Sequence, residues 1–285
     1  MIRGFDMKKY VILAGGLVAG GFHVAFAASV LHLFKNGPNH IASAMTLIVV
    51  LSLLVALSHK FRLFGGPMKE SVMQGNSHRT YLPAAGRDWL LPLYDVMTKL
   101  MGADRARAVL VEQAQVRPGQ RVLDLGCGTG SLTILLKRRH PEVDAVGLDP
   151  DPKALAQASR KAARAAVSIR LDRGFGDELP YPEASFDRVL CSLMFHHIPT
   201  DEKGKTLRAI RRVLKAGGEF HMLDFEGQEN SPHFLARLLH SGQRLKDNSE
   251  SRVLGLMTEA GFADPIKVGR RAMPFGHIAY YRAIA

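Results

Sequence analysis

The sequence predicts an α/β fold with a mostly parallel sheet and an antiparallel C-terminal hairpin, preceded by a hairpin of two transmembrane helices. Short apolar runs alternate with helical patterns through the second half of the chain, and a glycine-rich turn follows the first of these runs. Two long stretches near the N-terminus contain no charged residue. Alternation of strands and helices is typical of a parallel sheet covered by helices.

Length and composition set the outer limits of the prediction. A chain of 285 residues suits one core with an appendage. The formal net charge of +12 would favour nucleic acid, an anionic membrane surface or the cytoplasmic side of a membrane protein. The only cysteines are Cys127 and Cys191, which excludes a disulfide framework and a four-cysteine zinc site. We expect a reducing compartment and no metal.

The uncharged stretches predict a membrane anchor over residues 1–60. Val11 to Phe34 and Ile41 to Ser58 contain no Asp, Glu, Lys or Arg. At about 1.5 Å per helical residue, a stretch of about 18 to 24 residues can cross a hydrocarbon core of about 30 Å. The turn-forming residues 35–40 separate the two stretches. The pattern predicts two spanning helices, at about 11–34 and 41–58.

Flanking charges predict the orientation of this anchor. The turn carries only Lys35, whereas several basic residues flank the outer ends, namely Arg3, Lys8, Lys9, Lys60, Arg62 and Lys69. Both termini and the catalytic domain should therefore lie on the cytoplasmic face of the bilayer. Residues 25–27 resemble a signal-peptidase site, but the second helix would tether the chain even after cleavage. Residues 61–86 read as a linker and 87–285 as the domain.

The elements of the domain follow in order. The segment 89–102 is apolar with a helical second half, and is either a cover for the core or a substrate lid that touches the bilayer. The expected helices are Arg105–Gln115, Ser131–Arg139, Pro152–Ala166 and Thr206–Leu214. The expected strands are Arg121–Leu125, Ala145–Leu148, Val167–Leu171, Phe186–Ser192, Glu219–Asp224, Pro265–Val268 and His277–Ala283.

The turn after the first strand carries the strongest functional signal. In a parallel sheet, ligands bind beyond the carboxyl ends of the strands. Gly126, Gly128 and Gly130 let the backbone turn sharply and approach a ligand, and the helix that begins at Ser131 directs its amides toward the same place. Asp149 ends the second strand about 20 residues later, where a carboxylate can accept both ribose hydroxyls. The spacing predicts a nucleoside.

The glycine pattern distinguishes between nucleoside cofactors. Dinucleotide folds use G-x-G-x-x-G/A, whereas Gly130 followed by Ser131 makes the pattern here G-x-G-x-G. A compact loop headed by an acid, Asp124, suits a ligand that lacks a pyrophosphate and has an amino-acid end. S-adenosyl-L-methionine is such a ligand.

From about Tyr94 to Ala283 the sequence resembles the class I S-adenosylmethionine-dependent methyltransferases, which have a Rossmann-like fold. The motifs that carry this resemblance are Leu123-Asp124-Leu125-Gly126-Cys127-Gly128-Thr129-Gly130, Gly147-Leu148-Asp149, Leu179-Pro180-Tyr181-Pro182 with Ser185-Phe186-Asp187, and Val213-Leu214-Lys215-Ala216-Gly217-Gly218. Within the class, the sequence is most similar to the ubiquinone/menaquinone biosynthesis methyltransferases and related enzymes of lipophilic substrates. Tyr94-Asp95, followed by Met97 and Met101, supports that narrower resemblance.

The resemblance implies a set of cofactor contacts. Asp124 would organise the loop, Thr129 and the neighbouring backbone of Gly126, Cys127, Gly128 and Gly130 would hold the methionine end, Asp149 with Pro150 would bind ribose, and Ser192 would line the site. Where the family has an acidic or amide residue at the adenine, this sequence has Phe175. Either Phe175 stacks on the adenine while the Gly176 amide reads its edge, or Asp177 takes over through a shifted loop.

Two histidines follow the fourth strand. Methyl transfer needs alignment and, for some acceptors, a base. His196 or His197 could accept a proton from a phenol, an enol or an ammonium-derived group, with His196 favoured, although paired histidines also occur as plain loop residues. Tyr94 and Met194 are expected to contact the substrate.

These observations predict a membrane-anchored methyltransferase that acts on a small lipophilic acceptor such as a quinone precursor. The alternative is a phospholipid N-methyltransferase that acts on an amine headgroup. Nucleic-acid methylation is disfavoured, because residues 191–194 contain neither a Pro-Cys nucleophile nor an Asn/Asp-Pro-Pro-aromatic motif. A non-catalytic cofactor sensor is a further alternative, which would keep the glycine loop but not need the histidines.

Overall fold

A computed structural model of the chain describes residues 95, 98–99, 102–227, 248–273 and 276–285. The chain divides into two units, residues 1–70 and 71–285, and all described residues belong to the second. The predicted transmembrane helices, the predicted linker and Tyr94 lie outside the described residues. Among the helices that the structure describes, none has the length and apolar character needed to cross a membrane.

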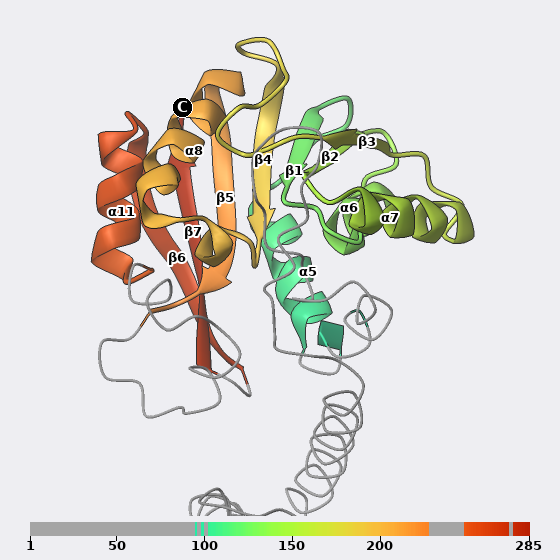
Figure 1. Ribbon diagram of the computed structural model, residues 1–285, viewed down its shortest axis with the longest axis horizontal. Helices are drawn as coiled ribbons and strands as arrows, with labels where there is room; N and C mark the ends of the chain where they lie inside the picture. The colour runs from blue at the N-terminus through green and yellow to red at the C-terminus, as the bar shows by residue number, and fades with distance from the viewer. Residues whose placement is uncertain (1–94, 96–97, 100–101, 228–247, 274–275) are drawn as a thin grey trace, which may run out of the picture. The chain divides into compact units, whose positions relative to one another are not determined.

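A seven-stranded sheet forms the centre of the domain (Figure 1). Its strands are β1 (Arg121–Leu125), β2 (Asp144–Asp149), β3 (Arg170–Arg173), β4 (Phe186–Ser192), β5 (Leu214–Phe225), β6 (Ala263–Met273) and β7 (Gly276–Ile284). The spatial order is β3-β2-β1-β4-β5-β7-β6. The first five strands are parallel, and β7 runs antiparallel to both β5 and β6. The predicted fold class is confirmed for this domain, including the appended hairpin.

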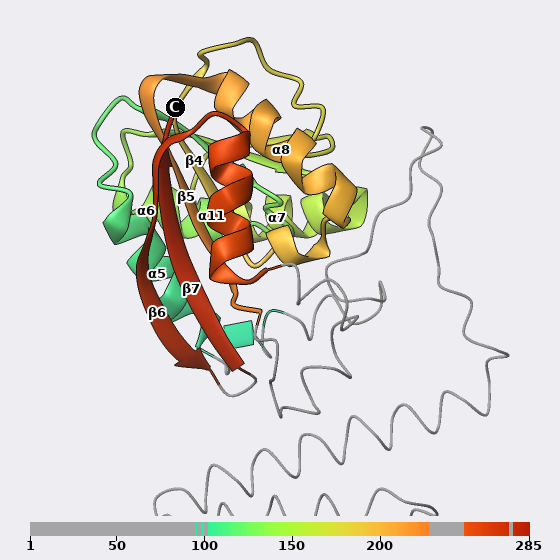
Figure 2. The same ribbon diagram turned by 90° about the vertical axis from the view of Figure 1, so that its left-hand side faces the viewer.

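Helices cover both faces of the sheet. The described helices are α5 (Ala103–Gln113), α6 (Ser131–Arg139), α7 (Pro152–Arg164), the 3₁₀ turn η3 (Phe195–His197), α8 (Thr200–Val213) and α11 (Glu250–Glu259). Apolar side chains of α5 and α6 share a core with Val122 of β1, whereas those of α8 and α11 share the opposite core with its neighbour Leu123. This alternation is the period-two pattern of a strand buried on both faces. Figure 2 shows the two helix layers on either side of the sheet.

Several boundaries differ from the sequence prediction for local reasons. The third strand begins at Arg170 instead of Val167, because α7 ends at Arg164 and Ala166 takes a left-handed conformation (φ 52°) in the turn that follows. Helix α8 begins at Thr200 instead of Thr206, with Asp201 and Glu202 in its first turn, where acidic side chains favour a helix N-terminus. Helix α11 was not predicted.

The strand register brings the functional loops to one edge of the sheet. Leu125, at the end of β1, is aligned with Leu148 on one side and with Cys191 on the other. Ser192, at the end of β4, is aligned with Leu223 of β5. The loops that follow β1, β2, β4 and β5 therefore emerge next to one another, as a ligand site in a parallel sheet requires.

Candidate active site

The glycine loop after β1 is held by backbone bonds from the neighbouring strand. The amides of Gly126 and Cys127 both donate to the carbonyl of Leu148, at 2.9 and 3.0 Å. Gly126, Gly128 and Gly130 all have left-handed backbone conformations, with φ of 69°, 53° and 75°. A side chain at these positions would be strained, so the G-x-G-x-G pattern is a conformational requirement of this turn.

The surroundings of the three glycines differ. A Cβ added at Gly126 would lie 2.2 Å from Cγ of Met194, and one at Gly130 would lie 2.8 Å from Cβ of Ala158. A Cβ at Gly128 would meet no described atom within 4 Å. Gly126 and Gly130 thus allow close packing, while Gly128 borders open space that a ligand can approach.

Asp149 joins the loop to the start of α7. Its Oδ2 accepts a bond from the Gly128 amide at 2.8 Å, and its Oδ1 accepts one from the Asp151 amide at 2.9 Å. Burial raises the pKa of Asp149 to about 6, although the two amide bonds oppose the shift. Beside it, the carbonyl of Pro150 accepts a bond from Arg173. Asp149 occupies the position expected of a ribose ligand, and it also organises the loop.

Asp124 lies beneath the loop. Its side chain is buried, and Oδ2 accepts a hydrogen bond from the hydroxyl of Thr133 in α6 at 2.6 Å. Burial raises its pKa to about 6. Cys127 also points inward, since a Cβ at Gly147 would lie 2.9 Å from its sulfur, and burial raises the pKa of this thiol. Asp124 thus joins β1 to α6, its role in organising the loop stays a prediction, and the Cys127 side chain packs in the core.

Two buried oxygens at this edge lack a protein partner among the described residues. They are Oγ of Ser192, at the end of β4, and Oδ2 of Asp151, whose other oxygen caps α7 by accepting from the Lys153 amide at 2.8 Å. Buried polar atoms in proteins are nearly always hydrogen-bonded. Both atoms therefore fit a site whose polar ligand completes the bonding, and a nucleoside with an amino-acid end has suitable groups.

The turn after β4 contains Met194, one of the two residues predicted to contact the substrate. Leu193 has a left-handed backbone (φ 56°), which is uncommon for a bulky residue, and its amide donates to the Leu223 carbonyl at 2.8 Å. Met194 follows and packs against Gly126. The side chain of Met194 therefore links the β4 turn to the cofactor loop.

His196 is paired with an aspartate from the next strand. Its Nδ1 lies 2.6 Å from Oδ1 of Asp224, and its amide donates to Oδ2 of the same carboxylate at 3.0 Å. Both side chains are buried, at 4% and 1% exposure. Burial raises the pKa of Asp224, but the contacts with His196 outweigh this and hold it below its ordinary value. The ring of His197 lies 3.9 Å away, centroid to centroid. The structure thus supplies His196 with an orienting carboxylate.

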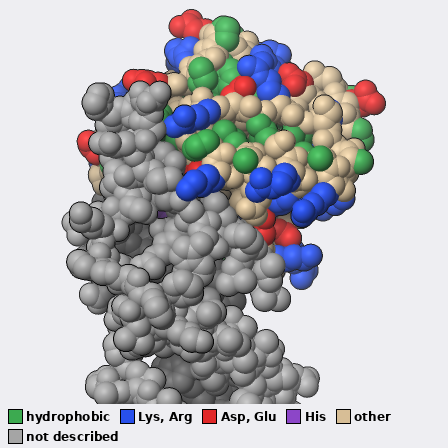
Figure 3. Space-filling view, turned by 45° about the vertical axis from the view of Figure 1, so that its right-hand side comes forward, with side chains coloured by type: hydrophobic (Ala, Val, Ile, Leu, Met, Phe, Trp, Pro, Cys, Tyr) green, Lys and Arg blue, Asp and Glu red, His purple; other side chains and the backbone are tan. Residues whose placement is uncertain are grey.

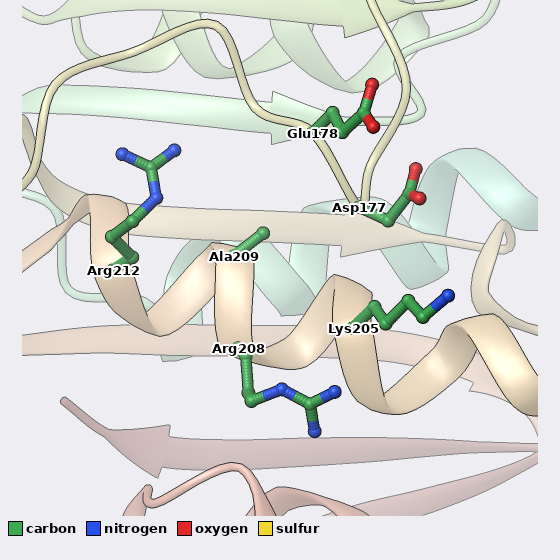
Figure 4. Close-up of a pocket in the computed structure, with 6 residues that line it drawn as sticks. All are labelled: Asp177, Glu178, Lys205, Arg208, Ala209 and Arg212. Carbon is green, nitrogen blue, oxygen red and sulfur yellow. The ribbon is translucent and has the colours of Figure 1, made fainter.

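The predicted alternatives for the adenine lie in the loop before β4. A Cβ at Gly176 would lie 3.2 Å from Cγ2 of Thr206 and 3.7 Å from Cδ1 of Leu125, so this residue is close to the carboxyl end of β1. Asp177 instead lines a shallow surface depression of about 430 Å³ over α8, with Glu178 and Lys205 (Figure 4). The two predicted adenine arrangements, through Phe175 with the Gly176 amide or through Asp177, both stay predictions.

Sequence reasoning missed two acidic side chains of the site. The sequence assigns no role to Asp95, yet its carboxylate accepts a bond from the Thr129 hydroxyl at 2.6 Å. The hydroxyl of Thr129, expected at the methionine end, is therefore engaged by Asp95. Asp224 was seen only as the end of a strand. Its position at the carboxyl end of β5, beside β4, was the available signal.

A comparison with known families agrees with this geometry. Residues 122–218 match the model of a methyltransferase domain. The chain contains a class I S-adenosylmethionine-dependent methyltransferase domain. The methyl donor of such a domain is S-adenosyl-L-methionine.

The relatives of this methyltransferase domain include quinone-modifying enzymes. The chain is 38% identical over 139 residues to the demethylmenaquinone methyltransferase of Deinococcus radiodurans, covering 48% of this chain and 57% of the relative. It is 38% identical over 141 residues to a ubiquinone/menaquinone biosynthesis C-methyltransferase of Xanthomonas oryzae, covering 46% and 54%. The chain therefore spans little more than half the length of these relatives.

Solved structures share the fold of the methyltransferase domain. The YcgJ protein of Bacillus subtilis superimposes with a TM-score of 0.53 at 20% identity, covering 63% of this chain and 97% of that one. A phosphoethanolamine N-methyltransferase of Haemonchus contortus, solved with S-adenosyl-L-methionine, gives 0.54 at 15% identity, covering 63% and 52%. Such distant likeness establishes the fold alone.

Proposed function

We propose that the chain is a membrane-anchored enzyme that transfers a methyl group from S-adenosyl-L-methionine to a small lipophilic acceptor, such as a quinone precursor. The observation that carries the choice of acceptor is the 38% identity to an enzyme named for demethylmenaquinone. The buried His196–Asp224 pair adds a base suited to an acidic hydroxyl.

The proposed chemistry divides between cofactor and protein. The bound cofactor supplies a methyl group already activated by its sulfonium. Since Nδ1 of His196 faces Asp224, the other ring nitrogen, Nε2, is the atom that would take the proton from the acceptor. The electron pair freed on the acceptor forms the new bond to the methyl carbon, the carbon–sulfur bond breaks, and its pair remains on sulfur. Asp224 would fix the ring tautomer and stabilise the imidazolium.

The proposed membrane attachment rests on the sequence and on surface charge. The uncharged stretches 11–34 and 41–58 are long enough to span a bilayer. In the domain, α7 carries Lys153, Arg160, Lys161 and Arg164 but no acidic residue. Figure 3 shows Lys and Arg side chains gathered around apolar ones on this side of the described domain. Anionic lipid headgroups attract such a surface, and we propose that the domain lies on the cytoplasmic side of the bilayer.

Methyl transfer from labelled S-adenosylmethionine tests the acceptor. The full chain would be incubated in detergent with demethylmenaquinone, with a ubiquinone precursor, or with phosphatidylethanolamine. Label in a quinone is the expected result. Label only in the phospholipid would replace the acceptor with an amine headgroup, and no label in any lipid extract would reject a lipophilic acceptor.

Alkaline carbonate extraction of membranes tests the anchor separately. The full chain should remain in the membrane pellet, because spanning helices resist extraction whereas electrostatically bound proteins are released. Recovery in the supernatant would reject the anchor without affecting the enzymatic proposal.

A further inference from the structure

A cluster of polar side chains lies against the glycine loop and centres on Asp95. Oδ1 of Asp95 accepts bonds from the Thr129 hydroxyl at 2.6 Å and, more weakly, from the Ser131 hydroxyl at 3.4 Å. Its Oδ2 accepts bonds from Lys161 at 2.9 Å and from Gln157 at 3.1 Å. Both carboxylate oxygens are thus used within the cluster.

Lys161 closes the cluster from the other side. Its ammonium donates to Asp95, to the Thr129 hydroxyl at 3.1 Å and to the Ser131 hydroxyl at 2.8 Å. The cluster therefore joins three segments that are remote in sequence: the helical residue 95 before α5, the glycine loop with the start of α6, and residues 157 to 161 of α7. Contacts between such segments restrict their relative movement.

The cluster is ionised and partly shielded from solvent. The side chains of Asp95 and Lys161 are 24% and 26% exposed. Burial raises the pKa of Asp95, but its bonds with Thr129 and Lys161 outweigh this and hold the pKa below its ordinary value. Asp95 also lies at the start of α6, whose N-cap residue Gly130 has no side chain to accept from the first amides. A negative charge is favourable there.

We propose that Asp95 and Lys161 are positioning residues for S-adenosylmethionine, which act by fixing the conformation of the loop from Gly128 to Gly130. Gly128 and Gly130 are both left-handed, and glycine backbones have the greatest freedom to lose on binding. Because Thr129 stands between them and is fixed through its hydroxyl, its amide is held ready for the ligand. The inference needs only the cofactor site and is independent of the acceptor.

A double-mutant cycle tests this proposal. Asp95→Asn and Lys161→Met would be made singly and together in the full chain, and the Kd for S-adenosylmethionine measured by calorimetry. Each single change should raise Kd about tenfold, since hydrogen bonds to charged groups contribute about 1.5 kcal/mol or more. Because Asp95 and Lys161 act through the same cluster, the double variant should bind S-adenosylmethionine about as well as the weaker-binding of the two single variants. Lys161→Arg, which keeps the charge, should recover most of the affinity.

Arg164→Met is the matched control, because it removes a positive charge from an exposed position of the same helix. It should leave Kd within about twofold of the original value. Thermal unfolding of every variant separates positioning from general stability. A lowered Tm with unchanged Kd would overturn the proposal, as would strictly additive effects on Kd in the cycle.

Discussion

The two halves of the proposed active site, one for the cofactor and one for the acceptor, are built in different ways. The cofactor half is a backbone structure, in which the left-handed glycines after β1 and the amides bound by Asp149 set the shape. The acceptor half is a side-chain structure, in which His196 after β4 meets Asp224 at the end of β5, 28 positions away. The first half should therefore govern binding of the cofactor, and the second should govern turnover.

The largest expected effect tests the acceptor half. Asp224→Asn or His196→Gln should lower kcat by about 10²- to 10⁴-fold, the usual contribution of a general base. The Asn variant keeps the size of the side chain but no longer selects the productive tautomer. Turnover with the lipid acceptor identified by labelling is the measurement. His197→Gln is the control, and a loss of kcat confined to that variant would transfer the role of base to His197.

The next effect tests the backbone character of the cofactor half. Gly126→Ala and Gly119→Ala both place a side chain on a left-handed backbone (φ 69° and 77°), which costs about 1–2 kcal/mol of stability in each case. Only the Cβ at Gly126 meets Met194, whereas that at Gly119 meets no described atom within 4 Å. Cofactor affinity should fall about tenfold, or more, in Gly126→Ala alone. If calorimetry showed equal losses of cofactor affinity in Gly126→Ala and Gly119→Ala, the backbone at Gly126 would have no specific role in binding the cofactor.

A third prediction concerns the buried carboxyl beneath the loop. The pKa of Asp124 is raised to about 6 by burial, so its stabilising contribution is complete below about pH 4 and is lost as the pH rises through 6. Relative to the natural chain, the free energy of unfolding of Asp124→Asn should rise by about 2 kcal/mol between pH 4 and pH 7. Asp149 is coupled to Asp124 by charge and contributes to the change, whereas carboxyls that do not interact with Asp124 act equally in both proteins and cancel in the difference. Denaturant unfolding of both proteins without cofactor measures this difference in stability. A stability difference that does not change with pH would contradict the raised pKa of Asp124.

The smallest expected effect concerns which residues of the loop before β4 contribute to cofactor binding. Asp177→Ala should leave cofactor affinity within about twofold, because this side chain lines the depression over α8. Gly176→Ala is the matched variant, and it should weaken binding more because its Cβ approaches Thr206 at 3.2 Å. If Asp177→Ala bound the cofactor more weakly than Gly176→Ala, the result would instead support an adenine contact made by Asp177 through a shifted loop.

The difference between local backbone motifs and contacts between distant side chains also explains which parts of the fold and the site the sequence could predict. The glycine loop and Asp149 were predictable because a contiguous stretch and one fixed strand spacing determine them. His196 could be proposed from the sequence, but its partner Asp224 depends on the pairing of β4 with β5. Likewise, Asp95 meets Thr129 only when the chain folds across 34 positions. Helix α11 was not predicted; its local signal is weak, because it contains Gly255 and its N-cap residue Ser249 makes no side-chain capping bond.

Calorimetric titration of S-adenosylmethionine into two variants tests the division between the halves most directly. Asp149→Ala removes the acceptor of two amide bonds as well as the expected ribose ligand, and its Kd should rise about 100-fold. Asp224→Asn should bind within about twofold of the original protein. A comparable loss of affinity in both variants would contradict the account, because the His196–Asp224 pair would then belong to the cofactor site.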